Sequence, residues 1–258
     1  MLKIERQNII DQEINKQGFV LVPAMSEMLK CSEETIRRDL KEMESQGRLM
    51  RTHGGAYLID NFDKTYPTNL RKTYYHQTKD CLARRAVEHM QENDIVMLDS
   101  STTCLALAEA MIRSQKMLSV ITNSLQICLL CNESNINNIN LICPGGAFRR
   151  RTSSFADQHT IDMLRTYHAD RAFISCPKLT VEYGLSDNHL SEARVRETML
   201  KQSQERYLIV DHTKFNSSAN ILFEGLELVD MIITDQKLDE DWERYIASHG
   251  IKVEYCTE

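Results

Sequence analysis

Four short segments carry side chains suited to holding a small, anionic, hydroxyl-rich molecule. They are residues 99–103, 122–124, 144–149 and 211–215, which combine hydroxyls, an amide, glycines, an arginine and a lysine. Hydroxyls and free backbone N–H groups at a helix start attract anions, and glycine lets the backbone approach a ligand closely. A lysine adds a point charge for phosphate. The residues we assign to this binding site are Asp99, Ser100, Ser101, Thr102, Thr103, Thr122, Asn123, Ser124, Gly145, Gly146, Arg149, Glu192 and Lys214.

Two other interpretations of these segments stay open. Ser and Thr at the start of a helix commonly serve only as N-caps. Alternatively, Asp99, Glu192, Asp211 and Lys214 supply a base and an electrophile for an enzyme. We expect no catalytic residue, no cofactor and no metal, because the eight histidines show no metal-ligand spacing.

A second set of residues has the spacing of a helix that enters the major groove of DNA. Ile36, Leu40 and Met43 recur at i, i+4 and i+7, so one helix face packs inward. Ser32 is suited to cap this helix and Gly47 to end it. A basic hairpin with a Gly-Gly turn follows, as in a wing. The residues we expect to face DNA are Thr35, Arg37, Arg38, Lys41, Arg51, Thr52, His53, Gly54 and Gly55.

The alternative to this DNA-binding helix is an ordinary solvated helix, and the charge balance does not decide between them. Residues 1–57 hold nine Lys/Arg and nine Asp/Glu, so net basicity is absent and only a local basic face remains. Two helices precede this segment: the first carries Ile10 and Ile14 and ends before Gly18, and the second spans residues 23–29. Three helices and a wing make a winged helix-turn-helix. We therefore expect a DNA-binding domain over 1–57, a linker over 58–75 and a second domain over 76–258.

Helical and strand patterns alternate from residue 76 onward, which is typical of an α/β domain with a mainly parallel sheet. The apolar strands show little polar alternation, as expected when both faces of a sheet are buried. Helices are predicted at 78–90, 103–112, 125–131, 192–204 and 239–248, and strands at 95–99, 118–122, 140–143, 172–175, 207–210, 231–234 and 251–255. Ligands of such sheets bind beyond the carboxyl ends of the strands, where the four polar segments fall.

The composition is ordinary for a soluble protein of about two domains, with 258 residues, 42% hydrophobic and 26% charged. The formal net charge of −6 falls on the C-terminal part, which discourages that part from lying along DNA. No apolar run reaches the roughly 18 residues of a membrane helix, and no signal peptide precedes the first helix. Eight scattered cysteines suit a reducing cytoplasm, and we interpret Cys128 and Cys131 as buried thiols in an apolar helix.

The run TIRRDLKEMESQGRLMRTHGGA, residues 35–56, resembles the DNA-binding signature of DeoR-type bacterial transcriptional regulators. Residues 122–124, 145–149 and 211–215 are similar to the effector domain of that family, as are residues 192–196, except that Arg196 stands where Lys is usual. The resemblance covers nearly the whole chain. It implies a winged helix followed by a sugar-phosphate-sensing domain related in fold to ribose-5-phosphate isomerase. It also implies that the two residue sets named above face DNA and the effector.

Two departures from the family pattern fall in the predicted effector site. Ser101 replaces a loop glycine, and residues 175–178, Ser-Cys-Pro-Lys, replace a glycine-rich stretch after a strand. Both changes narrow the site or add hydrogen-bond donors. The loop variants look more like the L-fucose operon activator branch, which implies a deoxy-sugar or other ketose phosphate as effector.

The leading prediction is a transcriptional regulator of a sugar-catabolism operon, controlled by a phosphorylated sugar. We expect a homo-oligomer, dimer or tetramer, on a repeated double-stranded DNA operator, because one small head makes too few contacts for specificity. The alternatives are an isomerase-like enzyme fused to a DNA-binding head, and a constitutive nucleoid or partner-binding protein with a vestigial pocket.

Overall fold

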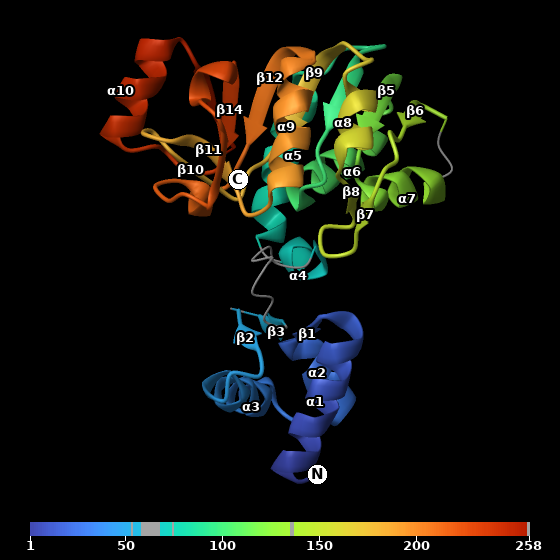
Figure 1. The fold of residues 1–258 in the computed structure, drawn as a ribbon, viewed down its shortest axis with the longest axis vertical. Helices are drawn as coiled ribbons and strands as arrows, with labels where there is room; N and C mark the ends of the chain where they lie inside the picture. The colour runs from blue at the N-terminus through green and yellow to red at the C-terminus, as the bar shows by residue number, and fades with distance from the viewer. Residues whose placement is uncertain (53, 58–67, 74, 135–136, 257–258) are drawn as a thin grey trace. The chain divides into compact units, whose positions relative to one another are not determined.

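The computed structural model describes residues 1–52, 54–57, 68–73, 75–134 and 137–256. The chain divides into two compact units, Met1–Tyr74 and Tyr75–Glu258, whose elements are labelled in Figure 1. Most of the predicted linker, residues 58–75, lies outside the described residues. Its described part contains one short helix, α4 (Thr68–Thr73).

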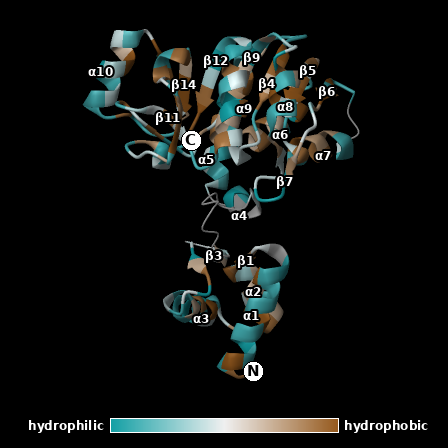
Figure 2. Cartoon of the chain, viewed as in Figure 1, coloured by the Kyte–Doolittle hydropathy of each residue, from teal (hydrophilic) through white to brown (hydrophobic). Residues whose placement is uncertain are grey.

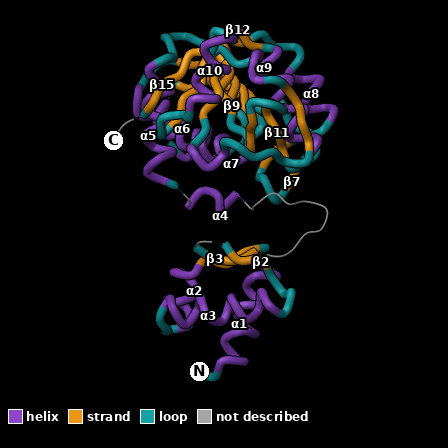
Figure 3. The backbone as a smooth tube through the Cα atoms, turned by 90° about the vertical axis from the view of Figure 1, so that its left-hand side faces the viewer, coloured by secondary structure: helices purple, strands orange, loops and turns teal. Residues whose placement is uncertain are grey.

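Ahead of the predicted linker, the N-terminal unit consists of three helices and a small antiparallel sheet (Figure 3). The elements are α1 (Lys3–Gln17), β1 (Phe19–Leu21), α2 (Val22–Leu29), α3 (Glu33–Ser45), β2 (Met50–Arg51) and β3 (Gly55–Tyr57), with sheet order β1-β3-β2. The predicted inward face of α3 is confirmed, because Ile36, Leu40 and Met43 are all buried and pack with Ile10 and Ile14 of α1. These elements form the winged helix-turn-helix that the sequence predicts.

The C-terminal unit is built on a seven-stranded sheet in which every strand pairing is parallel. Its strands are β4 (Ile95–Leu98), β5 (Leu118–Thr122), β6 (Ile139–Ile142), β9 (Ala169–Ile174), β12 (Ser203–Ile209), β14 (Met231–Thr234) and β15 (Lys252–Tyr255). Its helices are α5 (His76–Glu88), α6 (Thr102–Ser114), α7 (Leu125–Glu133), α8 (Gln158–Leu164), α9 (Leu190–Lys201) and α10 (Glu240–His249). The predicted α/β fold with a mainly parallel sheet is confirmed.

Helices cover both faces of this sheet, which explains the strands' lack of polar alternation. Alternate residues of each strand enter different cores: Met97 packs with residues of α8, α9 and α10, whereas Val96 and Leu98 pack with residues of α5, α6 and α7. Figure 1 shows α8 and α9 crossing in front of the sheet, and Figure 2 shows β4, β5 and β14 in the brown of apolar residues. Burial on two faces requires apolar side chains at successive positions.

The order of the strands, β15-β14-β12-β9-β4-β5-β6, contains a reversal. From β4 the chain proceeds outward through β5 and β6, and then returns to place β9 on the other side of β4. The loops that leave β4 and β9 therefore diverge at the carboxyl edge of the sheet. A crevice at such a switch point is where open α/β sheets bind ligands.

Several smaller elements were not predicted. They are a hairpin of β7 (Phe148–Arg149) and β8 (Ser154–Phe155), the helix α8, and a three-stranded antiparallel sheet of β10 (Lys178–Thr180), β11 (Gly184–Asp187) and β13 (Ile221–Glu224). These strands have two to four residues, too few to show a period. The predicted helix 192–204 is wrong at its end, because α9 stops at Lys201 and Ser203 already pairs with Ala169 of β9. Pairing with a neighbouring strand overrides local helix preference here.

Candidate functional site

The start of α3 is fixed by its N-cap. Ser32 Oγ accepts a hydrogen bond from the backbone N–H of Thr35 at 3.3 Å, and the two hydroxyl oxygens lie 2.9 Å apart. The Thr35 hydroxyl, predicted to face DNA, is therefore engaged in the cap and only half-exposed. The cap satisfies one of the free N–H groups of the first turn.

The cationic side chains of α3 differ in whether they form an ion pair. Arg37 Nη2 donates to Glu33 Oε2 at 2.8 Å, one helical turn away. Arg38 and Lys41 are exposed, and neither forms an ion pair with the residues that the structure describes. These two side chains are the ones most available to phosphates or base edges.

The hairpin β2–β3 is held against α3 and β1. The backbone N–H of Arg51 donates to Glu44 Oε1 at 2.8 Å, and that of Thr52 donates to the Gly55 carbonyl at 2.8 Å. A Cβ on Gly55 would lie 2.1 Å from the Val20 carbonyl oxygen, so only glycine fits at this strand crossing. The Arg51 guanidinium lies 3.7 Å from Glu44 rather than free in solvent. His53, also predicted to face DNA, lies outside the described residues.

A buried ion pair that the sequence analysis missed sets the position of α3 on α1. Arg6 Nε and Nη2 donate to the two carboxylate oxygens of Asp39 at 2.6 and 3.1 Å, and the Asp39 side chain is 3% exposed. The hydrogen bond to Asp39 raises the pKa of Arg6 despite partial burial. The available signal was an acidic residue between Ile36 and Leu40 on the apolar face, which calls for a buried partner.

At the switch point, the carboxylate of Asp99 directly follows β4. Its Oδ2 accepts from Arg196 Nε at 2.6 Å and from the Ser175 N–H at 3.4 Å, while its Oδ1 accepts from the Ser101 N–H at 3.0 Å. Arg196 Nη1 also bonds Asp187 at the end of β11. One guanidinium on α9 thus joins the ends of β4 and β11, and all of these side chains are buried.

Glu192, one turn before Arg196 on α9, is a second buried carboxylate. Its Oε1 accepts from Thr152 Oγ1 at 2.7 Å and from Ser154 Oγ at 2.5 Å. Its Oε2 accepts from Ser100 Oγ at 3.1 Å, and Arg149 Nε lies 3.5 Å from Oε1. The structure therefore brings together Asp99, Ser100, Arg149 and Glu192 of the predicted set, from the loop after β4, from β7 and from α9.

Two of the predicted hydroxyls act as helix caps. Ser101 Oγ accepts from the Cys104 N–H at 3.0 Å at the start of α6, and Ser124 Oγ accepts from the Ile127 N–H at 3.3 Å at the start of α7. Thr122 Oγ1 accepts from the Ser124 N–H at 3.1 Å. The hydroxyls of Thr102 and Thr103 bond no residue of the described part of the chain. The simple N-cap explanation thus applies to Ser101 and Ser124.

Asn123, at the end of β5, is buried but only half-satisfied. Its Nδ2 donates to the Phe155 carbonyl at 2.9 Å, which ties it to the β7–β8 hairpin. Its Oδ1 is buried and has no hydrogen-bond partner among the described residues, and the residue is 0% exposed. An unsatisfied buried acceptor calls for a water or a ligand donor.

The glycine loop that follows β6 is anchored to α8. Thr160 Oγ1 donates to the Gly145 carbonyl at 2.7 Å, and a Cβ on Gly146 would lie 2.3 Å from that hydroxyl oxygen. Hydrogen bonds from the backbone N–H groups of Thr160 and Ala147 lower the pKa of Asp157. Just before the loop, hydrogen bonds from the Cys128 thiol and the Gly145 backbone lower the pKa of exposed Cys143 to about 6. The two glycines thus shape the loop around α8, and Gly145 is half-buried whereas Gly146 is exposed.

Lys214 belongs to a neighbouring group at the end of β12. Its Nζ lies 3.7 Å from Oδ2 of Asp211, and its charge lowers the pKa of that carboxyl despite the opposing effect of burial. Burial raises the pKa of Cys176 to about 12, and the charges of both Arg196 and Lys214 act on this thiol. Cys176 therefore lies within electrostatic reach of both charge groups.

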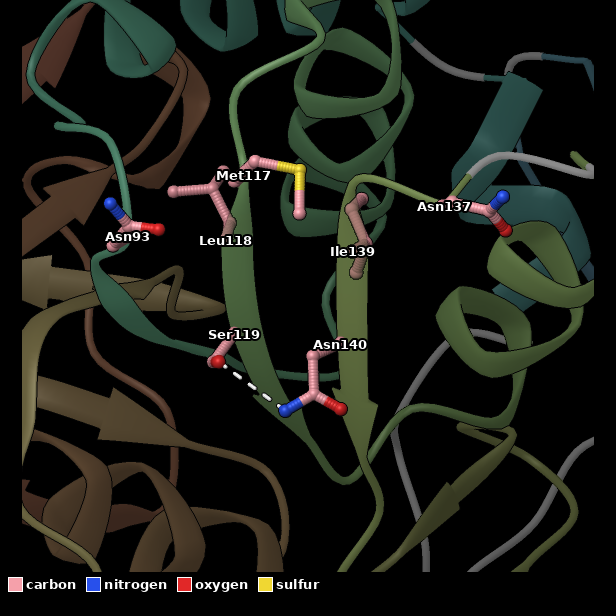
Figure 4. A pocket seen from close by; sticks show the side chains of 7 residues that line it. All are labelled: Asn93, Met117, Leu118, Ser119, Asn137, Ile139 and Asn140. Atoms are coloured by element: carbon pink, nitrogen blue, oxygen red, sulfur yellow. Dashed lines mark hydrogen bonds between the residues drawn. The ribbon is translucent and has the colours of Figure 1, made fainter.

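A surface pocket of about 400 Å³ lies at the amino edge of the sheet, opposite the edge that carries Asp99 and Glu192 (Figure 4). Asn93, Met117, Leu118, Ser119, Asn137, Ile139 and Asn140 line it, and Asn140 Nδ2 donates to Ser119 Oγ at 3.3 Å. These residues stand at or just before the amino ends of β4, β5 and β6, whereas Asp99, Glu192 and Arg196 and the half-satisfied Asn123 lie at the carboxyl edge. We therefore place the candidate site at the carboxyl edge.

The sequence analysis left four participants in the network unassigned. Arg196 lies on α9, Asp187 is the last residue of the short strand β11, and Thr152 and Ser154 lie on the β7–β8 hairpin and its loop. The one available signal was an acidic residue at the end of an apolar strand segment. The described residues contain no group of His, Cys, Asp or Glu arranged to hold a metal ion. No helix among them combines the length and apolarity that crossing a bilayer requires.

Comparison with known proteins gives matches along nearly the whole chain. Residues 6–62 match the DeoR-like helix-turn-helix domain, and residues 75–236 match the DeoR C terminal sensor domain. The uncharacterized HTH-type transcriptional regulator YulB of Bacillus subtilis is 31% identical over 98% of this chain and 96% of its own length. The L-fucose operon activator of Escherichia coli is 31% identical over 92% of this chain and 96% of its own length.

More distant relatives extend this comparison. The glycerol-3-phosphate regulon repressor of Escherichia coli is 27% identical over 99% of this chain and 100% of its own length. Among solved structures, ribose 5-phosphate isomerase A from Neisseria gonorrhoeae aligns with 54% of this chain and 53% of that chain, at 17% identity and a TM-score of 0.38. Both family domains and the near full-length matches agree: the chain belongs to the DeoR family of helix-turn-helix transcriptional regulators.

Proposed function

We propose that this regulator controls an operon for sugar or polyol catabolism and that a phosphorylated sugar, bound at the carboxyl edge of the parallel sheet, controls its binding to DNA. The observation that carries the proposal is the polar network at the switch point between β4 and β9. Asp99 and Glu192 are buried there, and protein donors orient them. Next to these two carboxylates lie other polar side chains that can bind a ligand.

The chemistry of these groups fits a hydroxyl-rich anion. Oriented carboxylates such as Glu192 accept hydrogen bonds from sugar hydroxyls, and the free Oδ1 of Asn123 accepts another. The unpartnered hydroxyls of Thr102 and Thr103 stand at the start of α6, where the helix dipole favours negative charge. Lys214 supplies a cation at the end of β12. A phosphate with a polyhydroxyl chain uses all of these groups.

The names of the relatives support the substrate class. One relative activates an L-fucose operon, another represses a glycerol-3-phosphate regulon, and a third, from Bacillus subtilis, is the regulator IolR. Sequence identity near 30% supports a shared mode of regulation and leaves the individual effector to be measured. Both activation and repression require that the effector bind one arrangement of the DNA-binding heads better than another.

Thermal unfolding of the full chain against a panel of sugar phosphates and their unphosphorylated sugars tests the proposal. A ligand at about 100 times its dissociation constant adds roughly 2.7 kcal/mol of stability and raises the Tm visibly. We expect one phosphorylated sugar to raise the Tm selectively and to change operator affinity in a gel-shift assay. If no compound in a wide panel does either, the sensor function is wrong.

The isomerase alternative makes a different prediction in the same experiment. An enzyme with Asp99 or Glu192 as base interconverts aldose and ketose phosphates, so product analysis after incubation detects turnover above the buffer rate. A ligand that raises the Tm and is recovered unchanged supports the sensor over the enzyme.

A further inference from the structure

We propose that Lys178 is a second cation of the effector site, which binds the effector's phosphate together with Lys214 and strengthens the preference for phosphorylated over neutral sugars. Because Lys178 acts in the site proposed above, the inference rests on that function. It adds a residue outside the predicted set and a physical basis for specificity.

The position of Lys178 is fixed by the small antiparallel sheet. Lys178 opens β10 and pairs in register with Ser186 of β11, whose Oγ donates to the Lys178 carbonyl at 2.9 Å. The next residue, Leu179, is 0% exposed and packs in the core. Because side chains alternate along a strand, Lys178 points to the opposite face from Leu179. The backbone of Lys178 is therefore held in place, and its side chain is half-buried.

The ammonium of Lys178 reaches the turn that carries Lys214. Lys178 Nζ donates to the Thr213 carbonyl at 2.9 Å, and Thr213 is the immediate neighbour of Lys214 in the 3-10 turn His212–Lys214. Lys214 Nζ lies 3.7 Å from Asp211, too far for a hydrogen bond. An ammonium group has three donors, so the pair retains most of its N–H groups for a ligand.

The two lysines are short of negative charge. Burial, and after it the charge of Lys214, lower the pKa of Lys178, as expected for two ammonium groups that act on each other with only part of their charge compensated. The carboxylate that faces both is Asp211, whose own pKa is lowered by Lys214 and by Lys79 against the effect of burial. Burial keeps the nearby Cys176 thiol protonated and uncharged. A phosphate dianion relieves this repulsion through charge-assisted hydrogen bonds.

Lys178 also lies where this chain departs from its family. Residues 175–178 replace the glycine-rich stretch of the DeoR-type pattern, and a glycine there offers neither a charge nor a side-chain donor. β9 ends at Ile174, between β4 and β12, so this stretch leads from the switch point to Lys178.

The test compares full-length wild type with Lys178→Gln, Lys178→Arg, Lys214→Gln and Lys237→Gln. Lys237 is a 78% exposed lysine of the same unit and serves as the matched control. The probes are inorganic phosphate and the sugar-phosphate panel, and the readout is the apparent dissociation constant from Tm shifts at constant ionic strength. Loss of a charged hydrogen bond predicts roughly tenfold or greater weakening in Lys178→Gln. We expect near wild-type binding in Lys178→Arg and Lys237→Gln.

The possible outcomes separate this inference from the function on which it rests. Weakening in Lys178→Gln, with an unliganded Tm close to wild type and rescue by Lys178→Arg, supports the two-lysine subsite. Wild-type affinity in Lys178→Gln combined with weakening in Lys214→Gln overturns the role of Lys178 and leaves the sensor function standing. Absence of any phosphate response in the wild type overturns both.

Discussion

Arg196 is the residue on which the buried charges of the candidate site depend. It lies between Asp99 and Asp187, and its pKa is raised by their charges and by that of Glu192, which outweigh the effect of burial. A single buried guanidinium that bonds two carboxylates compensates charges that burial alone makes costly. A lysine offers no planar fork for two carboxylates, whereas the guanidinium of Arg196 bonds both Asp99 and Asp187.

Replacing this guanidinium therefore has a large effect on stability. Arg196→Met leaves Asp99 and Asp187 buried without their shared cationic partner, and we expect a loss of about 3–5 kcal/mol in the free energy of unfolding. Urea unfolding of the full chain measures it. Arg194→Met, on the exposed face of α9 with a side chain 55% exposed, is the matched control and should cost little. A loss below about 1 kcal/mol in Arg196→Met contradicts the assigned role.

A pH-dependent prediction concerns Cys143, next to the glycine loop. Hydrogen bonds from Cys128 and the Gly145 backbone lower its pKa to about 6 against the effect of burial, so the thiolate predominates above that pH. We expect its alkylation rate with iodoacetamide to rise through pH 6 and level off near neutrality, whereas an ordinary thiol responds near about 8.5. Mass spectrometry of labelled peptides from pH 5 to 9 measures the rate. A midpoint near 8.5 refutes the shift, and Cys143→Ser provides the blank.

At the scale of elements, α3 carries the DNA-binding prediction. Arg38 and Lys41 are its exposed cations without an ion pair in the described residues, whereas Arg37 and Arg51 form ion pairs with Glu33 and Glu44. The free cations should contribute most to operator affinity, because the paired ones must first break a protein contact. The sequence could not rank them, since pairing depends on rotamers and on the position of the hairpin.

We expect Arg38→Ala and Lys41→Ala each to weaken operator binding by about 1–3 kcal/mol if they contact bases. If either contacts phosphate instead, the salt dependence of log K should decrease in slope by about 1. Fluorescence anisotropy at several salt concentrations distinguishes the two cases. Lys16→Ala, an exposed residue of α1, is the control. Affinity within about twofold of wild type for both variants rules out this face of α3.

The hairpin gives a stability prediction for the same unit. A Cβ on Gly55 meets the Val20 carbonyl oxygen at 2.1 Å, so Gly55→Ala must separate β1 from β3. We expect a loss of about 1–3 kcal/mol or more in the N-terminal unit. Gly18→Ala, at a left-handed position with no atom within 4 Å of the added Cβ, should cost only about 1 kcal/mol. Equal Tm shifts for the two variants contradict the close approach of the strands.

For the whole molecule, the proposed regulation is a coupling between two sites. If an effector changes operator affinity by some factor, the operator must change effector affinity by the same factor, typically 5- to 150-fold in such systems. Titrations of effector with and without saturating operator DNA, together with the reverse titrations, measure both factors on the full chain. Unequal factors contradict a simple two-site coupling. If neither ligand changes the affinity for the other, the effector does not regulate DNA binding.

The sequence by itself determined the features that depend on local order. Periodicity located the buried face of α3, apolar runs located the strands of a two-sided sheet, and a contiguous motif indicated the family. It also placed the polar residues near strand ends, because the residue after an apolar run is known from order alone. Patterns of this kind survive folding because each reflects the burial of neighbouring residues along one element.

Only the tertiary structure decided which of those residues meet. The reversal of strand order between β4 and β9 creates the switch point, and order along the chain does not reveal it. The Glu192 network joins residues 38–92 positions apart, and the bonds of Arg6 to Asp39 and of Lys178 to Thr213 each cross more than 30 positions. Serine and threonine residues that looked alike in the sequence have different roles in the structure. Some cap helices, some donate hydrogen bonds to carboxylates, and some have no partner among the described residues. That distinction comes from three-dimensional packing, because a hydrogen bond depends on distance and angle between groups that the sequence leaves far apart.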